Sequence, residues 1–432
     1  MPGCCTCCSA LARSTLISDG TPAALIMFVA IFLLPLFLPL FRGNFPLMLI
    51  YWFVLGLHQA IAITNAYLFT TFGADLDAAT FHRIGTELAG AEEFSIGIGG
   101  EFYINMLGVV YWVFGPSHLL GQQLSILAFS LSCIVLIKIV HLLGRAQYEV
   151  PILFCFGALP TMVLLGSVTM RESYQVLFFM LAVYFGLRCQ ISGKIRFLFG
   201  TVISALAMGL FHNGLILYAG FLITLVMTWR LRPASGLWMV SKLRLLSIVM
   251  IPLGVFGLMI ALNVGPDIAG TNALKSATTG ELLEYAALYR EKSVTARATY
   301  GVTLDTSSWG AFIPSSLAVL FYYLFTPFPW QVGNLIDVYA FMEVLWRMTL
   351  IFYAIKEWRI AQGSLKEMFG FMLLLYFSMA FLWALGTTNY GTGMRHHMVH
   401  YWIIIVLGLP PLVDAFKTVA LKTVVERHLL VE

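Results

Sequence analysis

The sequence predicts an all-α fold, a polytopic bundle of transmembrane helices. Of the 432 residues, 60% are hydrophobic and only 11% are charged, whereas soluble domains carry about 25% charged residues. Apolar runs such as 21–41, 122–142 and 398–416 are long enough, as helices, to cross a hydrocarbon core about 30 Å thick. These runs are apolar on every side and lack the alternating pattern of barrel strands, so we expect helices.

We predict about 11 spans, and we treat residues 21–432 as a single transmembrane domain that follows an N-terminal tail at 1–20. The predicted spans are 21–41, 46–69, 117–142, 150–168, 173–189, 197–212, 214–229, 245–263, 335–355, 369–386 and 398–416. The apolar segment 311–325 is shorter and ends in Thr326-Pro-Phe-Pro-Trp330, which cannot continue a helix. We therefore predict a re-entrant or interfacial helix there.

Basic residues are concentrated in short loops on one side of the predicted bundle, for example at Arg42, Arg145 and Lys366. By the positive-inside rule these loops are cytoplasmic. The opposite face then carries three outer loops, 70–116, 264–310 and 387–397, and we expect the chemistry there. The net charge of +4 is small and lies largely on the basic loops, so nothing indicates a nucleic acid partner.

Two acidic residues follow the second predicted span directly, Asp75 and Asp77. Carboxylates at the bilayer surface stay ionised, and they suit a general base toward a sugar or phosphate-bearing substrate, or a divalent cation. His82, Arg83 and, further along, Glu101 add polar side chains to the same loop. The alternative is a solvated helix start, because acidic residues are favoured in a first helical turn.

Arg171 and Glu172 form a charged pair between two strongly apolar spans. A charge in the middle of a span costs about 2.5–3.5 kcal/mol, so such a residue usually has a partner or a function. An arginine here could hold a phosphate with its planar fork of donors. The alternative is that the pair lies in water at the end of a hairpin.

His212 and Asn213 lie between two short predicted spans. Short helices can meet below the membrane surface and place their polar turn in a cavity. The alternative is an ordinary helix-capping turn of asparagine and glycine.

Arg395 and His396 lie in the glycine-containing outer loop 387–397. The glycines allow the backbone to approach a ligand closely, and Arg395 offers two parallel hydrogen bonds to a phosphate. Adjacent histidines on a helix point in different directions, so we expect no metal site here. The alternative is contact with lipid headgroups.

Three stretches of the chain resemble the GT-C superfamily of membrane glycosyltransferases, especially the branch similar to dolichyl-phosphate-mannose and aminoarabinose transferases. They are Gly73-Ala-Asp75-Leu-Asp77 with His82, the segment 102–123, and the turn ending in Arg171-Glu172-Ser173. Thr326–Trp330 and Gly391–His396 also look similar to related polysaccharide-biosynthesis proteins. The resemblance covers most of the region 73–397 and implies a GT-C-like helix bundle.

The resemblance implies transfer of a hexose or pentose from a polyprenyl-phosphate-linked donor to a hydroxyl of a glycan, lipid or protein acceptor. Asp75 or Asp77 would be the base, and Arg171 and Arg395 would stabilise the leaving phosphate. The remaining candidate substrate-binding residues are His82, Arg83, Glu101, Glu172, His212, Asn213 and His396. The setting would be the outer, periplasmic face of a prokaryotic plasma (inner) membrane, during cell-surface glycan synthesis. No cofactor is certain, and a divalent cation, Mg²⁺ or Mn²⁺, is the one candidate.

Two other functions stay open at this stage. A lipid-linked repeat-unit polymerase, of the O-antigen or exopolysaccharide kind, would share the membrane face, the lipid carrier and the outer arginines, but it does not obviously require the acidic first loop. A secondary transporter would show repeated halves, paired broken helices and mid-membrane charges, and the sequence contains no evident internal repeat. Partner subunits are not indicated by the sequence.

Overall fold

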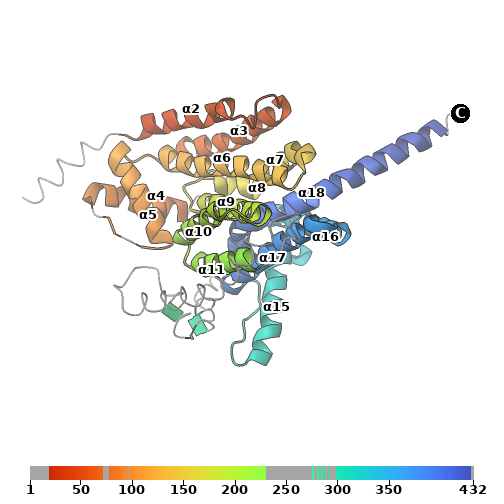
Figure 1. Ribbon diagram of the computed structural model, residues 1–432. Coiled ribbons are helices and arrows are strands. Elements are labelled where there is room, and N and C mark those ends of the chain that lie inside the picture. Colours follow the sequence, from red (N-terminus) through yellow and green to blue (C-terminus); the bar gives the residue numbers. More distant parts are fainter. Residues whose placement is uncertain are drawn as a thin grey trace, which may run out of the picture.

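A computed structural model gives the fold of the chain (Figure 1). It describes residues 19–71, 77–92, 94–95, 97–229 and 298–429, together with 275–276, 280–281, 284–285, 288 and 290. The predicted span 245–263 and nearly all of the predicted tail lie outside the described residues. Within the described residues the secondary structure is almost entirely helical, which confirms the predicted all-α class.

The described part of the chain is mainly a succession of helices. In order they are α2 (Thr21–Phe37), α3 (Phe45–Tyr67), α4 (Asp77–Ala91), α5 (Gly100–Phe114), α6 (His118–Leu142), η1 (Ala146–Tyr148), α7 (Glu149–Gly157), α8 (Pro160–Gly166), α9 (Glu172–Ser192), α10 (Ile195–Leu210), α11 (Asn213–Thr228), α15 (Trp309–Phe325), η2 (Pro329–Gln331), α16 (Leu335–Ile360), α17 (Gly363–Gly386) and α18 (Tyr390–Leu429).

Six of the described helices are long and apolar enough to cross a membrane. They are α3, α6, α9, α16, α17 and the part Tyr390–Thr418 of α18. A seventh is added if the bent pair formed by α7 and α8 is counted as one span. The chain therefore has the helices of a multi-pass membrane protein, as the composition predicts.

The described residues do not confirm the predicted number of 11 spans. Helices α2, α10, α11 and α15 have only 16 or 17 residues each. At a rise of about 1.5 Å per residue they are about 24–26 Å long, which is less than a hydrocarbon core of about 30 Å. Figure 1 shows α15 running crosswise to α2, α3 and α6. Its predicted re-entrant or interfacial character stays a prediction.

The predicted span 150–168 is interrupted at Ala158 and Leu159, where α7 and α8 meet at a bend of 60°. Helix α8 begins at Pro160, because proline fits the first turn of a helix but not its interior. The Glu343 carboxylate of α16 accepts hydrogen bonds from the Thr161 backbone N–H (2.8 Å) and hydroxyl (2.6 Å). The first turn of α8 is therefore hydrogen-bonded to a buried carboxylate.

Two predicted outer loops contain helices. The first, 70–116, folds mostly into the antiparallel pair α4 and α5. The prediction of a loop at 387–397 is wrong from Tyr390 onward, because α18 begins there and carries Arg395 and His396 in its second turn. Gly393 allows this helix to pack closely, since a Cβ at that position would lie 2.4 Å from the Tyr300 hydroxyl.

Polar contacts gather at two ends of the bundle. We call one the site end, where α4, α9 and α18 begin; α4 and α5 gather there in Figure 1. We call the other the basic end. There Arg145 forms an ion pair with Glu357, and the Tyr148 hydroxyl donates a hydrogen bond to Asp414. The assignment of these ends to the two membrane faces stays a prediction from the positive-inside rule.

The core between the two ends is apolar and closely packed. In α18, the run Ile403–Leu407 has no exposed surface. The backbone of this helix approaches α16 closely at Gly408, where a Cβ would lie 2.2 Å from the Leu350 carbonyl oxygen. Small residues permit such close approach between membrane helices.

Replacing Gly408 by alanine should lower the thermal unfolding midpoint of the detergent-purified protein, because a backbone carbonyl cannot move aside as a flexible side chain can. The expected cost is about 1–3 kcal/mol, as for other overpacked interiors. Gly220→Ala is the matched control, since nothing lies within 4 Å of a Cβ built there. Equal midpoints for both variants would contradict the proposed close contact.

Candidate functional site

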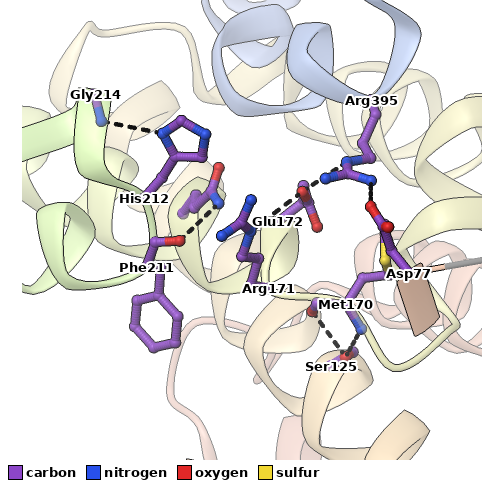
Figure 2. A network of polar contacts seen from close by, with 10 residues as sticks. Asp77, Ser125, Met170, Arg171, Glu172, Phe211, His212, Gly214 and Arg395 are labelled. Atoms are coloured by element: carbon purple, nitrogen blue, oxygen red, sulfur yellow. Dashed lines mark hydrogen bonds and ion pairs between the residues drawn. The ribbon is translucent and has the colours of Figure 1, made fainter. Parts of the chain in front are cut away.

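Charged side chains from three helices converge at the site end (Figure 2). Asp77 is the first residue of α4, Glu172 is the first residue of α9, and Arg395 lies in the second turn of α18. The Arg395 Nε atom lies 2.8 Å from Glu172 Oε1, and an Nη atom of the same guanidinium forms an ion pair with Asp77. Arg395 therefore ties together three helices that are far apart in the sequence.

Arg171 extends this arrangement from the turn before α9. Its Nε atom lies 3.8 Å from Glu172 Oε1, and its guanidinium lies 5.9 Å from the centroid of the Phe81 ring. Figure 2 shows Glu172 between the two arginines. We call Asp77, Arg171, Glu172 and Arg395 the charged network. Its two carboxylates and two guanidinium groups balance in formal charge.

The turn that carries Arg171 is held by hydrogen bonds to an apolar helix. The Ser125 hydroxyl of α6 donates a hydrogen bond to the Met170 carbonyl oxygen (3.1 Å), and it accepts one from the Met170 backbone N–H (3.2 Å). Neither Ser125 nor Phe81 is among the site residues predicted from the sequence. A buried serine inside an otherwise apolar span is the one signal that could have identified Ser125, because such a hydroxyl needs a partner.

The two carboxylates of the charged network differ in how far their side chains are exposed. The side chain of Glu172 is 2% exposed, whereas that of Asp77 is 50% exposed. Glu172 Oε2 has no hydrogen-bond partner among the described residues. Glu172 is therefore placed to orient the two arginines, and Asp77 is the carboxylate that a molecule from outside can reach.

His212 lies on the other side of Arg171 and caps α11. Its Nδ1 accepts a hydrogen bond from the Gly214 N–H (3.2 Å). Burial, and then the nearby charges of Arg171 and Arg395, lower the pKa of His212 well below its usual value. The imidazole is therefore neutral at physiological pH, and because Nδ1 is the acceptor, its proton is on Nε2.

His396 is packed inside the bundle beside His212. Its Nδ1 lies 2.8 Å from the Thr387 hydroxyl, and its ring stacks on Trp383 with 4.0 Å between ring centroids. The His212 ring lies 6.2 Å from the His396 ring. Thr387 and Trp383 therefore hold His396 next to the charged network. The contact with Trp383 is not predicted from the sequence.

Several predicted site residues on α4 and α5 have partners outside the charged network. Arg83 and Glu87 form an exposed pair at 2.7 Å. His82 Nδ1 lies 2.9 Å from the Tyr111 hydroxyl, and burial lowers the pKa of His82 to about 4. Glu101 is exposed in the first turn of α5. The substrate-binding role predicted for these residues stays a prediction.

Asp75 lies outside the described residues, so its position relative to the charged network stays a prediction. Asn213 begins α11, and its Oδ1 is buried without a hydrogen-bond partner in the described part of the chain. Gly99 packs directly against it, because a Cβ at Gly99 would lie 2.4 Å from that oxygen. Asn213 thus lies where the segment before α5 meets the turn between α10 and α11.

The described residues contain no group of three or more His, Cys, Asp or Glu side chains placed to hold a metal ion. Of the two aspartates predicted as cation ligands, Asp77 is ion-paired with Arg395. A divalent cation beside Asp77 would therefore lie against a guanidinium group, which electrostatics disfavours. The described side chains do not fit Mg²⁺ or Mn²⁺ at this position.

Arg290 holds the connection before α15 to the end of α17, immediately before α18 begins. Arg290 is 5% exposed and donates hydrogen bonds to the carbonyls of Ala384 (2.8 Å), Thr387 (2.8 Å) and Val302 (3.1 Å). It thereby satisfies carbonyls at the end of α17, which have no partner within the helix. The backbone also pairs between 298–300 and 388–390.

No protein family model, curated protein or solved structure matches the chain. The resemblance to GT-C glycosyltransferases therefore rests on the motifs quoted above.

A double-mutant cycle tests the buried ion pair between Glu172 and Arg395. The substitutions Glu172→Gln and Arg395→Gln should each destabilise the protein, and their effects should be non-additive by about 1–3 kcal/mol, measured by reversible unfolding in mixed detergent. The exposed pair Arg83 and Glu87 is the control, with an expected coupling of about 0.5 kcal/mol or less. Strict additivity at Glu172 and Arg395 would show that the two side chains do not interact.

Proposed function

We propose that the chain is a membrane glycosyltransferase that moves a sugar from a polyprenyl-phosphate-linked donor to an acceptor hydroxyl. The observation that carries the proposal is the ion pair between Asp77 and Arg395, which are 318 residues apart. The residue expected to act as the base and the residue expected to bind the phosphate are therefore in contact. The positive-inside rule favours the non-cytoplasmic face for this end of the bundle.

The reaction needs a carboxylate that can reach the acceptor. Asp77 is half exposed, and Glu172 is buried beneath the arginines. We assign Asp77 as the general base that accepts the proton of the acceptor hydroxyl. The hydroxyl oxygen then forms a bond to the anomeric carbon, and the bond from that carbon to the phosphate oxygen breaks. This single in-line displacement inverts the anomeric configuration.

The leaving group is polyprenyl phosphate, which departs with the electron pair of the broken bond. Arg395 and Arg171 would stabilise its negative charge, which is the role that usually supplies the largest part of catalysis. Glu172 would act as a positioning residue, because it contacts both guanidinium groups. Neutral His212 adds an N–H donor next to Arg171.

The same geometry suggests how donor binding prepares the base. Arg395 is bound to Asp77 in this structure, so the guanidinium group occupies the carboxylate that would have to accept the proton. A phosphate that takes up the guanidinium would release Asp77 toward the acceptor. Base activation would then follow donor binding, which would limit proton abstraction when no donor is present.

The substitution Asp77→Asn should lower the rate of transfer by about 10²–10⁴-fold, the contribution of a general base. Arg395→Gln should lower it by about 10²–10³-fold through loss of charge stabilisation. The assay is release of labelled sugar from a panel of polyprenyl-phosphate hexoses and pentoses by the protein in liposomes. Glu87→Gln is the control and should retain full activity, because Glu87 is exposed and, among the described residues, forms its ion pair with Arg83 and not with the charged network.

Asp75→Asn and the double variant are measured in the same assay, because the sequence leaves either aspartate as the base. Full activity in both single variants and in the double variant would refute the base assignment. A ladder of polymerised repeat units, in place of a single transferred sugar, would favour the repeat-unit polymerase.

One observation favours a second function, secondary transport. The bent pair α7 and α8 meets the buried carboxylate of Glu343 at its break, and transporters place ionisable groups at broken helices in the membrane. A transporter would accumulate a labelled solute in liposomes without forming a covalent product, and Glu343→Gln would abolish that uptake. Covalent sugar transfer that persists in Glu343→Gln would exclude this function for the chain.

A further inference from the structure

A second polar cluster lies on the face of α18 opposite to Arg395. It consists of Arg347 of α16, Tyr323 of α15, Tyr376 of α17, and His397 and His400 of α18, and we call it the Arg347 cluster. Successive helical residues are rotated by about 100°, so 397 and 400 point away from 395. The rings are in contact, with centroid distances of 4.1 Å between Tyr323 and His397 and 4.9 Å between Tyr376 and His400.

Arg347 carries a buried positive charge in a helix long enough to span a membrane. The residue is 2% exposed, and its Nε donates a hydrogen bond to the Leu324 carbonyl at the end of α15 (2.9 Å). Among the described residues, no carboxylate lies within ion-pair distance of it. Glu343, one turn earlier, binds Thr161 instead. The guanidinium charge therefore has no ion-pair partner within the described bundle.

Around this charge, buried polar atoms have no hydrogen-bond partner among the described residues. They are Tyr323 Oη, Tyr376 Oη, His397 Nδ1 and both ring nitrogens of His400. The four residues are between 0% and 3% exposed. An unsatisfied buried polar group costs about 1–3 kcal/mol, so this many at one place indicate a polar ligand between them.

The type of ligand follows from charge and enclosure. The guanidinium charge disfavours a cation, and an anion would compensate that charge more fully than a neutral water molecule would. The near-complete burial of the cluster excludes a phosphate that remains attached to a lipid chain in the bilayer. Two tyrosine hydroxyls and one N–H of His400 can donate hydrogen bonds, and Arg347 supplies the positive charge.

We propose that Arg347, Tyr323, Tyr376 and His400 form a buried binding site for a small inorganic anion of the size of chloride. This site is distinct from the charged network and independent of the proposed transfer reaction. The anion would link α15, α16, α17 and α18. It would thereby hold α18 to α15, α16 and α17, whereas the charged network holds α18 to α4 and α9.

Bromide is the probe for this site. The thermal unfolding midpoint of the full-length protein in detergent should be several degrees higher in sodium bromide or chloride than in sodium gluconate at equal ionic strength, because a bound ligand stabilises the folded state. The double substitution Tyr323→Phe and Tyr376→Phe, which removes two hydroxyl donors and keeps both rings, should abolish the difference. Tyr218→Phe is the control, since that hydroxyl already donates to the Leu375 carbonyl (2.8 Å), and it should keep the full halide effect.

Crystals grown in bromide should show an anomalous scattering peak within hydrogen-bond distance of the Tyr376 hydroxyl. Equal midpoints of the unsubstituted protein in bromide and gluconate would overturn the proposal. So would a halide effect that survives in the double variant, or a crystal structure with water alone at this position. Because the bromide measurements use the unsubstituted chain, they remain decisive if the double variant does not fold.

Discussion

The contact of Arg395 with both Asp77 and Glu172 is the interaction on which the site end depends. A guanidinium group presents several donors in one plane, so it can hold two carboxylates from different helices at once. The start of α18 is thereby fixed to the starts of α4 and α9. The contact with Glu172 is buried, so loss of either partner there would leave a charge uncompensated where water is scarce.

The charged network also shows how similar residues take different roles. Asp77 and Glu172 are both in the first turn of a helix, where a negative charge is favoured by the helix dipole. Their surroundings differ, because Glu172 is packed under two arginines while half of the Asp77 side chain is open. This difference in exposure, together with the shared contact to Arg395, is the basis for proposing Asp77 as the base and Glu172 as a positioning residue.

The fold class and six span-length helices could be predicted from the sequence, because a long apolar run has few alternatives in a bilayer. The break before Pro160 could not be placed, since it depends on Glu343 from a distant helix. The apolar pattern predicts a span only from residue 398 and leaves Arg395 in a loop, yet α18 begins at Tyr390, and Gly393 packs against Tyr300 inside this helix. The sequence motifs predict Asp77, Arg171, Glu172 and Arg395 as site residues. Their mutual contacts could not be predicted, because they form only when helices far apart in the sequence pack together.

The Arg290 contacts have a mechanical consequence. Arg290 holds the carbonyl end of α17 to Val302, and backbone hydrogen bonds join 298–300 to 388–390, immediately before the helix that carries Arg395. A displacement of residues 298–300 would therefore be transmitted within one or two helical turns to the guanidinium group that holds Asp77.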